Sequence, residues 1–248
     1  ACQHLGTGMG LGSQRAMLEN EKLIDTYFVR DVAPDIFLLG NIGIAQILHY
    51  EIEDILDLPK KVEADGLAVH VNPAQEVIQP DGDRNWKGAK TKLRELCKKA
   101  RYPVIAKEVG FGISAKMAKT LASLGVKAID IAGAGGTNWA KIEQYRGGRS
   151  IPEWGIPTAE CLLEVRKSVR LPIIASGGIR SGFDIAKAIA MGADLCGLAK
   201  PLLKPALKSW RAVVEHLKNI IEELRIAMFL VNAKNIKELK RAAWTREY

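Results

Sequence analysis

The stretch Val69-His70-Val71-Asn72-Pro73-Ala74-Gln75-Glu76 leads from an apolar segment directly into a cluster of polar side chains. The run that begins it, Gly66–Val69, is short and apolar, which predicts a buried β-strand. Pro73 has no backbone N–H to donate to a strand ladder, so we expect the strand to end before it. Turn-forming residues at 79–83 indicate that the chain then leaves through a loop. This strand is therefore predicted to deliver a histidine, two amides and a carboxylate to the edge of an active site.

The same change from apolar to polar residues recurs on both sides of this strand. We predict strands separated by helices at intervals of about 30 residues, which is the spacing of βαβ units. The predicted strands are 6–13, 35–41, 66–71, 102–107, 126–132, 172–176 and 194–198. The predicted helices are 13–30, 44–56, 87–100, 114–124, 139–145, 157–169, 183–191 and most of the chain from 202 onward. Polar residues recur at the carboxyl ends of the strands, namely Ser13, Asn41, His70, Lys107, Thr137 and Ser176.

The pattern predicts an α/β fold with a parallel sheet. Strands that are apolar on both faces are typical of a parallel sheet covered by helices. Polar strand ends around the whole set favour a (β/α)8 TIM barrel, because a doubly wound sheet concentrates its chemistry at one switch point. Seven units are found where a closed barrel has eight, so we expect the first strand to be absent from the given sequence. Residues 1–248 are expected to form a single domain.

Composition and charge narrow the class of protein. Apolar residues make up 48% and charged residues 26%, which is ordinary for a soluble globular protein, and no apolar run reaches the ~20 residues of a membrane span. The net charge of +8 lies mainly on predicted helices, and the few aromatic residues do not interleave with it, so neither nucleic-acid nor membrane binding is expected. The four cysteines (Cys2, Cys97, Cys161 and Cys196) lack metal-site or disulfide spacing, which indicates reduced thiols and a cytoplasmic location.

Two late loops have the composition of a phosphate site. Ser176-Gly177-Gly178-Ile179-Arg180 and Gly197-Leu198-Ala199-Lys200 follow the last two predicted strands. In barrels of this kind these two loops commonly hold a phosphate with backbone N–H groups and a helix N-terminus. A simple tight turn is the alternative for the two glycines, but the presence of both loops favours phosphate binding.

Lys107 and His70 each allow a structural and a functional interpretation. A lysine at a strand end can extend to solvent along its aliphatic stem, but its position among the other polar ends favours contact with a cofactor or substrate. A single histidine is often a satisfied core residue, and the polar neighbours of His70 give a functional role equal weight.

Several motifs together carry a resemblance to a known family. They are Gly12-Ser13-Gln14-Arg15, Gly40-Asn41-Ile42-Gly43, His70–Glu76, Lys107-Glu108-Val109-Gly110, Gly135–Trp139, Trp154–Thr158 and Ser176–Arg180. In this order, over nearly the whole chain, they resemble the type 2 isopentenyl-diphosphate delta-isomerase family of FMN-dependent TIM barrels. The resemblance implies FMN, Mg²⁺, NADPH as reductant, and an isoprenoid diphosphate substrate. It also implies reduced FMN as the acid/base in the interconversion of isopentenyl and dimethylallyl diphosphate, and a homo-oligomer, either a tetramer or an octamer.

The resemblance assigns roles to residues by their positions in these motifs. Glu76 would bind Mg²⁺, while Gln75, Arg15 and His70 would contact the substrate and Gln75, His70 and Asn72 would be catalytic. The flavin positions would be Ser13, Asn41, Lys107, Ala132 and Thr137, with Gly177, Gly178, Ile179, Ala199 and Lys200 at its phosphate. The family usually has a serine where this chain has Ala132, so one flavin hydrogen bond is expected to be lost.

Two other functions remain open. The first is an FMN-dependent oxidoreductase of the α-hydroxy-acid oxidase type, which shares the barrel and the glycine-rich phosphate loop. That class needs a catalytic histidine late in the barrel, and none of the histidines (His4, His49, His70 and His216) lies at a late strand end. The second is a truncated barrel that binds flavin without turnover. The motifs favour the isomerase over both.

Overall fold

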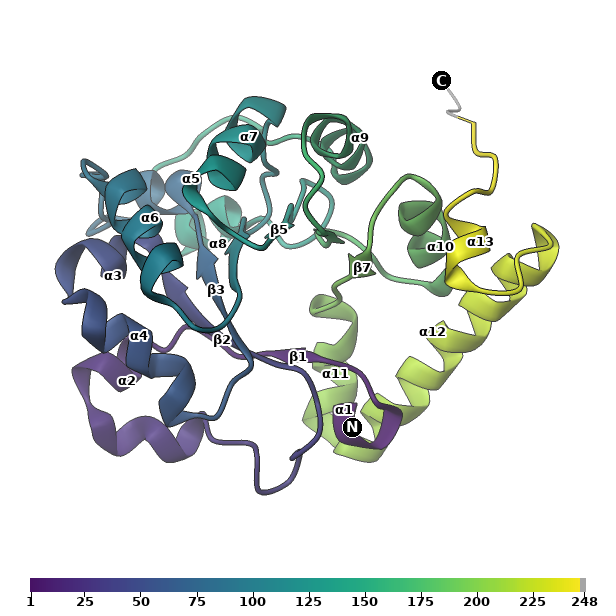
Figure 1. Cartoon of the computed structure of the whole chain (residues 1–248), viewed down its shortest axis with the longest axis horizontal. Coiled ribbons are helices and arrows are strands. Elements are labelled where there is room, and N and C mark those ends of the chain that lie inside the picture. Colours follow the sequence, from purple (N-terminus) through teal and green to yellow (C-terminus); the bar gives the residue numbers. More distant parts are fainter. Residues whose placement is uncertain (246–248) are drawn as a thin grey trace.

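A computed structural model describes residues 1–245. Seven parallel strands form one sheet whose spatial order equals the chain order, and helices follow the strands along the chain, so the α/β barrel architecture is confirmed (Figure 1). The strands are β1 (Met9–Gly10), β2 (Leu38–Gly43), β3 (Gly66–His70), β4 (Val104–Lys107), β5 (Ala128–Asp130), β6 (Ile173–Ala175) and β7 (Leu195–Cys196).

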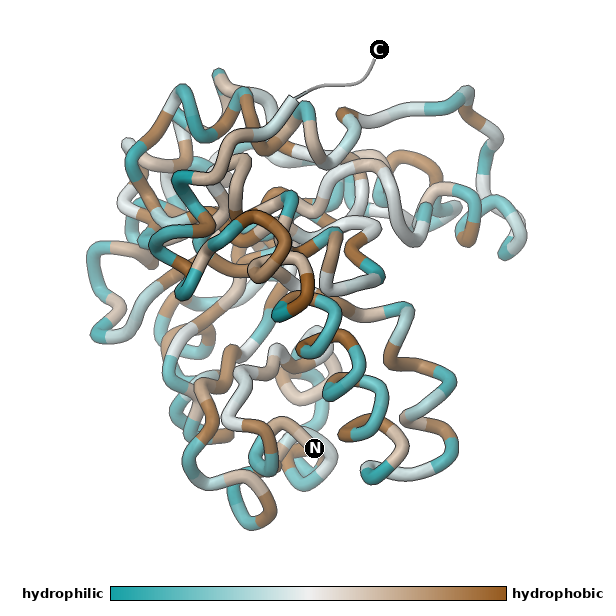
Figure 2. The backbone as a smooth tube through the Cα atoms, turned by 90° about the vertical axis from the view of Figure 1, so that its right-hand side faces the viewer, coloured by the Kyte–Doolittle hydropathy of each residue, from teal (hydrophilic) through white to brown (hydrophobic). Residues whose placement is uncertain are grey.

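Helices cover the sheet, and the part of the chain that follows β7 is also helical. They are α1 (Cys2–Leu5), α2 (Arg15–Glu19), α3 (Ile44–His49), α4 (Ile52–Lys61), α5 (Pro73–Ile78), α6 (Ala89–Lys99), α7 (Ala115–Leu124), α8 (Trp139–Tyr145), α9 (Thr158–Ser168), α10 (Gly182–Ala190), α11 (Lys200–Lys208), α12 (Trp210–Leu230) and α13 (Ile236–Leu239), with the 3₁₀ helix η1 at Glu21–Thr26. Figure 2 shows hydrophobic and hydrophilic stretches alternating along the helices, as expected for helices that bury one face. Within residues 1–245, no helix combines the length and apolarity needed to cross a bilayer.

The strand register separates an apolar layer from the polar strand ends. One row across β2 to β6 is fully buried beneath the helices and consists of Ile42, Val69, Ala106, Ile129 and Ile173. The next row, one residue further along each strand, is Gly43, His70, Lys107 and Asp130. Because successive residues of a strand point to opposite faces, the core between sheet and helices forces this second row onto the inner face.

The two edges of the sheet are short and partly exposed. β1 and β7 contain two residues each, shorter than the sequence pattern predicts, and among residues 1–245 each pairs with only one neighbouring strand. Met9 on β1 is 40% exposed and Leu195 on β7 is 59% exposed. The seven described strands therefore form an open, curved sheet rather than a closed ring.

The structure differs locally from some of these expectations. The strand ends before Pro73 and a loop follows at 79–83, both as predicted, but the helix α5 between them was not predicted. Pro73 occupies the first turn of α5, where a missing N–H costs nothing. The predicted helix 13–30 is divided into α2 and η1 at Asn20, whose side chain accepts a hydrogen bond from Lys22 N. By contrast, α8 has the predicted bounds, and Ser114 caps α7 as predicted, its hydroxyl accepting from Met117 N at 3.3 Å.

Candidate active site

His70 at the end of β3 is held by the neighbouring strand. Its Nδ1 lies 2.8 Å from Oδ1 of Asn41, whose Nδ2 donates to the carbonyl oxygen of Leu11 at 3.1 Å. The amide oxygen Oδ1 of Asn41 can only accept a hydrogen bond. In the neutral imidazole, Nδ1 of His70 therefore carries the proton and Nε2 is left as an acceptor. Burial and the positive charge of Lys107 lower the pKa of His70 to about 4. His70 is therefore a neutral imidazole at pH 7 and a weak base.

Gln14 fixes the backbone that carries Asn41. This side chain is fully buried, its Oε1 accepts from the N–H of Asn41 at 2.9 Å, and its Nε2 donates to the carbonyl oxygen of Leu58 at 3.3 Å. A single side chain thus links the β1–α2 loop, β2 and α4. The structure brings Asn41 and His70 together as a rigid pair.

Lys107 at the end of β4 forms an ion pair that sequence reasoning missed. Its Nζ lies 2.7 Å from Oδ2 of Asp130, and Oδ1 of Asp130 accepts from the hydroxyl of Ser176 at 2.5 Å and from Ala132 N at 3.3 Å. Asp130 is only 7% exposed. The available signal was a lone carboxylate inside the predicted strand 126–132, whose residues from Ala128 onward are otherwise apolar.

The polar residues of α5 form a second cluster beside β3. Nδ2 of Asn72 donates to Oε1 of Gln75 at 3.2 Å and to Oε1 of Glu76 at 2.8 Å, and the other oxygen of Glu76 accepts from Asp83 N at 2.8 Å. Asn72 is 3% exposed, yet its Oδ1 has no hydrogen-bond partner within the described residues. A buried acceptor without a partner is costly, which points to a donor that the chain itself does not supply.

Glu143 on α8 is a further buried carboxylate that the sequence did not single out. Its Oε1 accepts from Nε2 of Gln75 at 2.9 Å and lies 3.7 Å from the guanidinium of Arg146. Only 3% of Glu143 is exposed. Gln75 is therefore fixed from both sides, by Asn72 at the N-cap of its own helix and by Glu143 on α8. The partner lies far along the chain, so no local pattern could have revealed the contact.

Arg15 lies on the same side of the molecule as α5. Its guanidinium pairs with Glu19 at 2.7 Å, and its pKa is raised first by that hydrogen bond and, to a smaller extent, by the negative charges of Glu19 and Glu76. Its side chain is largely exposed and so remains accessible to an anion. Arg15 and Glu76 are therefore close enough to interact electrostatically, although no direct contact joins them.

The late glycine turn is packed against the loop after β5. Gly177 and Gly178 have φ values of 92° and 96°, and a Cβ on either would lie within 2.5 Å of a carbonyl oxygen of the 133–135 segment. Arg180 joins the two loops by donating to the carbonyl oxygens of Gly178 and Gly135 at 2.9 and 2.5 Å. Among residues 1–245, the N–H groups of Gly177, Gly178 and Ile179 have no acceptor. Three free N–H donors in succession suit an anion such as a phosphate.

The remaining predicted positions frame this region without direct contacts among themselves. Ser13 is exposed and its carbonyl oxygen accepts from the Tyr27 hydroxyl at 2.8 Å, while Thr137 is half-buried in the loop after β5. Ala199 is the N-cap of α11 and Lys200 its first residue, both exposed, and both follow β7, the neighbour of β6. Parallel strands place all these carboxyl ends at one edge of the sheet.

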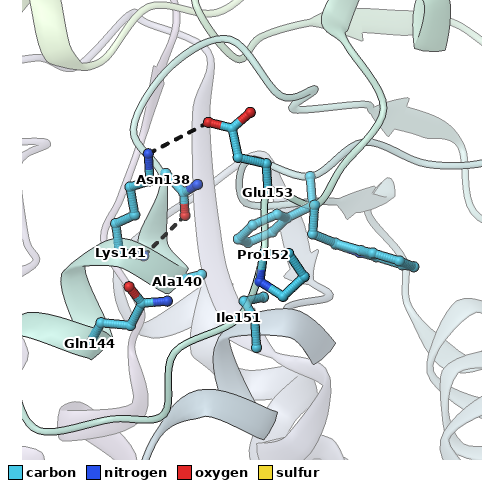
Figure 3. Close-up of a pocket in the computed structure, with 9 residues that line it drawn as sticks. Asn138, Ala140, Lys141, Gln144, Ile151, Pro152 and Glu153 are labelled. Atoms are coloured by element: carbon cyan, nitrogen blue, oxygen red, sulfur yellow. Dashed lines mark hydrogen bonds and ion pairs between the residues drawn. The ribbon is translucent and has the colours of Figure 1, made fainter.

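A small pocket lies against α8, the helix that carries Glu143. It is lined by Phe111, by residues of α8 and its N-cap, and by the segment 151–154. Figure 3 shows Lys141 extending toward Glu153, 3.8 Å away, and Asn138 capping the helix by accepting from Lys141 N at 3.1 Å. No predicted site residue lines this pocket, so it is separate from the cluster at the strand ends.

Comparison with known structures agrees with the fold. The chain is similar to a mandelate oxidase (16% identity, TM-score 0.64, covering 96% of this chain and 78% of that one). It is also similar to GMP reductase from Trypanosoma brucei (22% identity, TM-score 0.60, covering 86% and 46%). At these identities the likeness shows the fold alone.

Sequence comparison identifies the family. The family model described as "FMN-dependent dehydrogenase" matches residues 45–246 of this chain. The chain is 48% identical to the isopentenyl-diphosphate delta-isomerase of Pyrococcus abyssi, over 97% of this chain and 69% of the relative. It is 45% identical to that of a Nostoc species (97% and 71%) and 47% identical to that of Mycolicibacterium vanbaalenii (97% and 72%). The chain therefore belongs to the isopentenyl-diphosphate delta-isomerase family, within the FMN-dependent dehydrogenase fold.

Proposed function

We propose that this chain interconverts isopentenyl diphosphate and dimethylallyl diphosphate in isoprenoid biosynthesis, with reduced FMN as acid/base and Mg²⁺ holding the diphosphate. The observation that carries the proposal is the identity of 45–48% to named isomerases over at least 97% of the chain. The two polar clusters at the strand ends are consistent with it. They provide a cationic and hydrogen-bonding wall for a flavin and an acidic side for a metal and its diphosphate.

The residues present fit FMN. The three free N–H groups of Gly177, Gly178 and Ile179 would hold its phosphate, with Ala199 and Lys200 at the start of α11 beside them. Ser13, Asn41, Lys107 and Thr137 would contact the ring system, and an ammonium near its pyrimidine edge favours the anionic reduced form. Ala132 has no hydroxyl and would offer only its backbone. The bound reduced flavin would supply the proton-transfer chemistry.

The side chains of the chain would bind and orient the substrate. Moving the double bond requires a proton to be added at one carbon and removed from another. His70 is neutral at pH 7, with a pKa of about 4, so it would accept a hydrogen bond through Nε2 rather than protonate the alkene. Gln75, held by Asn72 and Glu143, would orient the reacting carbons. The free Oδ1 of Asn72 would accept a donor from the bound substrate or its water shell.

Glu76 is the proposed ligand of Mg²⁺. Among residues 1–245, no group of three or more histidine, cysteine, aspartate or glutamate side chains could hold a metal alone. Mg²⁺ is commonly bound by one or two carboxylates together with substrate phosphates and water, and a carboxylate that accepts two hydrogen bonds still has free lone pairs. Glu76 fits that description, and Arg15 would add positive charge for the diphosphate.

Further features of the proposal concern the whole protein. We propose a single FMN-binding domain over residues 1–248, NADPH as the reductant, a cytoplasmic location and no nucleic-acid partner. We also propose a homo-oligomer, either tetramer or octamer. Exposed apolar side chains on α11 and α12, where Leu207 is 80% exposed and Phe229 is 83% exposed, are compatible with self-association.

The test follows allylic product from isopentenyl diphosphate after anaerobic reduction of the bound flavin, with and without Mg²⁺. We expect allylic product to form only when the flavin is reduced and Mg²⁺ is present. Glu76→Gln should remove the magnesium dependence and most of the activity while the Kd for FMN stays near normal, and Glu215→Gln on α12 is the control. Flavin reduction by a 2-hydroxy acid would instead support the oxidase function. Bound flavin without turnover of either substrate would indicate a non-catalytic barrel.

A further inference from the structure

Asp130 links three neighbouring strands at the edge where the flavin is proposed to bind. Its two oxygens accept hydrogen bonds from Lys107 on β4, from Ser176 directly after β6 and from the backbone of Ala132 after β5. We call these four residues the Asp130 cluster. Asp130 is 7% exposed, and its carboxylate has one cationic partner and two further hydrogen-bond donors, which offset the cost of burying its charge.

The cluster places a negative charge beside the cation proposed to face the flavin. The Lys107 side chain is 31% exposed and that of Asp130 is 10% exposed, so the lysine is the more accessible partner of the pair. Lys107 also stands next to His70 in the strand register, with Asp130 on its other side. In such a partly buried pair the carboxylate both fixes the position of the ammonium and cancels part of its field.

The same carboxylate stabilises the backbone that leads to the phosphate turn. Ala132 has a φ of +32°, which is strained for a residue with a Cβ, and its N–H donates to Asp130. The next residue, Gly133, donates its N–H to the carbonyl oxygen of Ser176 at 3.1 Å. Asp130 therefore connects Lys107 to the turn at Gly177 and Gly178 in two ways. One is the hydrogen bond from the Ser176 hydroxyl, and the other runs through Ala132 and Gly133 to the Ser176 carbonyl oxygen.

We propose that Asp130 is a positioning residue that fixes Lys107 at the flavin and sets the reduction potential of bound FMN by partly neutralising the lysine. This inference rests on the proposed FMN site. Loss of the carboxylate charge leaves the Lys107 charge uncompensated, which stabilises the anionic reduced flavin and raises its potential. Loss of Lys107 acts in the opposite direction. The cluster thus provides a charge balance at the flavin, in addition to its structural role.

The experiment measures the reduction potential and the Kd of FMN for the full chain carrying Asp130→Asn, Asp130→Glu or Lys107→Met. We expect Asp130→Asn to raise the potential and to weaken FMN binding by about tenfold, because Lys107 and Ala132 lose a charged acceptor. Lys107→Met should lower the potential. Asp130→Glu keeps the charge at a shifted position, so its Kd should rise while its potential stays close to that of the wild type.

Asp194→Asn is the matched control. Asp194 also accepts hydrogen bonds from a lysine, Lys240 at 2.5 Å, and from a backbone N–H, that of Ile173 at 2.9 Å. It precedes β7, however, and so lies at the amino ends of the strands, opposite the carboxyl ends where the flavin is proposed to bind. We expect neither the potential nor the Kd to change in this variant. A purely structural role for Asp130 would shift the potential equally in Asp130→Asn and Asp130→Glu, which would overturn the proposal.

The outcomes separate this inference from the proposed function. A wild-type potential and Kd in Asp130→Asn, with both altered in Lys107→Met, would overturn the role of Asp130 and leave the flavin site intact. Wild-type values in Lys107→Met would instead overturn the placement of FMN. If Asp130→Asn does not fold, Asp130→Glu decides the question, and a Kd unchanged from wild type would contradict the proposal.

Discussion

His70 owes its neutral state to its surroundings, and this has a measurable consequence for stability. The unfolded chain binds a proton on this ring below a pKa of about 6.5, whereas the folded ring resists protonation down to about 4. We expect the free energy of unfolding of the wild type, relative to His70→Gln, to fall as the pH is lowered from 6.5 to 4. The full effect has an upper value of roughly 3 kcal/mol. Urea unfolding at several pH values measures it.

The difference between wild type and variant is needed because Glu108 has the opposite effect. Burial raises the pKa of this carboxyl to about 7 despite the hydrogen bonds from backbone N–H groups, so its contribution to stability is lost as the pH rises through that value. His49→Gln is the control, because the His49 side chain is 61% exposed and pairs with Asp83, away from Asn41 and Lys107, which surround His70. Parallel stability curves for wild type and His70→Gln would contradict the assignment of His70 as a buried neutral ring.

At the scale of elements, the sequence predicted the existence of most strands and helices but not their ends. Apolar runs such as 66–71 predict a strand because burial depends on the residues themselves. The length of β1 and β7 depends on how many ladder partners the neighbouring strand offers, which no local pattern encodes. Pro73 correctly predicted the end of the strand, but the helix α5 that it begins was not predicted, because proline fits both a loop and the first turn of a helix.

The candidate site was predictable to a similar degree. The positions with family motifs, such as His70 and Asn41, lie together at the strand ends, and their roles stay predictions. Asp130 and Glu143 were missed because the donor that satisfies each carboxylate, on Lys107 or Gln75, comes from a different element far along the chain. A buried charge needs a partner, but the sequence does not say which one.

The close contact between α10, the helix after the phosphate turn, and α12 leads to a prediction about the stability of the fold. A Cβ on Gly182 would lie 2.2 Å from the backbone N of Leu224 and 2.3 Å from the carbonyl oxygen of Ile220, and the N–H of Gly182 donates to Glu223 at 2.7 Å. Gly182→Ala should therefore push α12 away and destabilise the fold by about 2 kcal/mol or more. Thermal unfolding measures the change.

Gly10→Ala is the matched control for that substitution. A Cβ on Gly10 would meet no atom within 4 Å, and its φ is not in the left-handed region, so its stability should remain within about 0.5 kcal/mol of wild type. Equal melting temperatures for the two variants would mean that α12 packs less closely on α10 than the structure indicates.

At the scale of the whole molecule, the sheet is strongest at its centre and weakest at its edges. β2, β3 and β4 pair over the longest registers, whereas β1 and β7 contribute two residues each and have exposed side chains. A ligand that contacts residues after β1 and after β7 would connect the two edges. Its binding free energy would then be distributed between the local turn and the closure of the sheet.

Hydrogen exchange of the free and FMN-saturated protein tests this distribution. We expect the amides of β3 to exchange most slowly in both states, since opening them requires global unfolding. FMN should slow exchange at least tenfold at Gly177, Gly178 and Ile179, whose N–H groups lack acceptors, and more modestly along β1 and β7. The end of α12 around Phe229 serves as the internal control, because it is distant from every proposed flavin contact along the chain. Protection confined to that helix end, with the glycine turn unchanged at saturating FMN, would show that the flavin binds elsewhere.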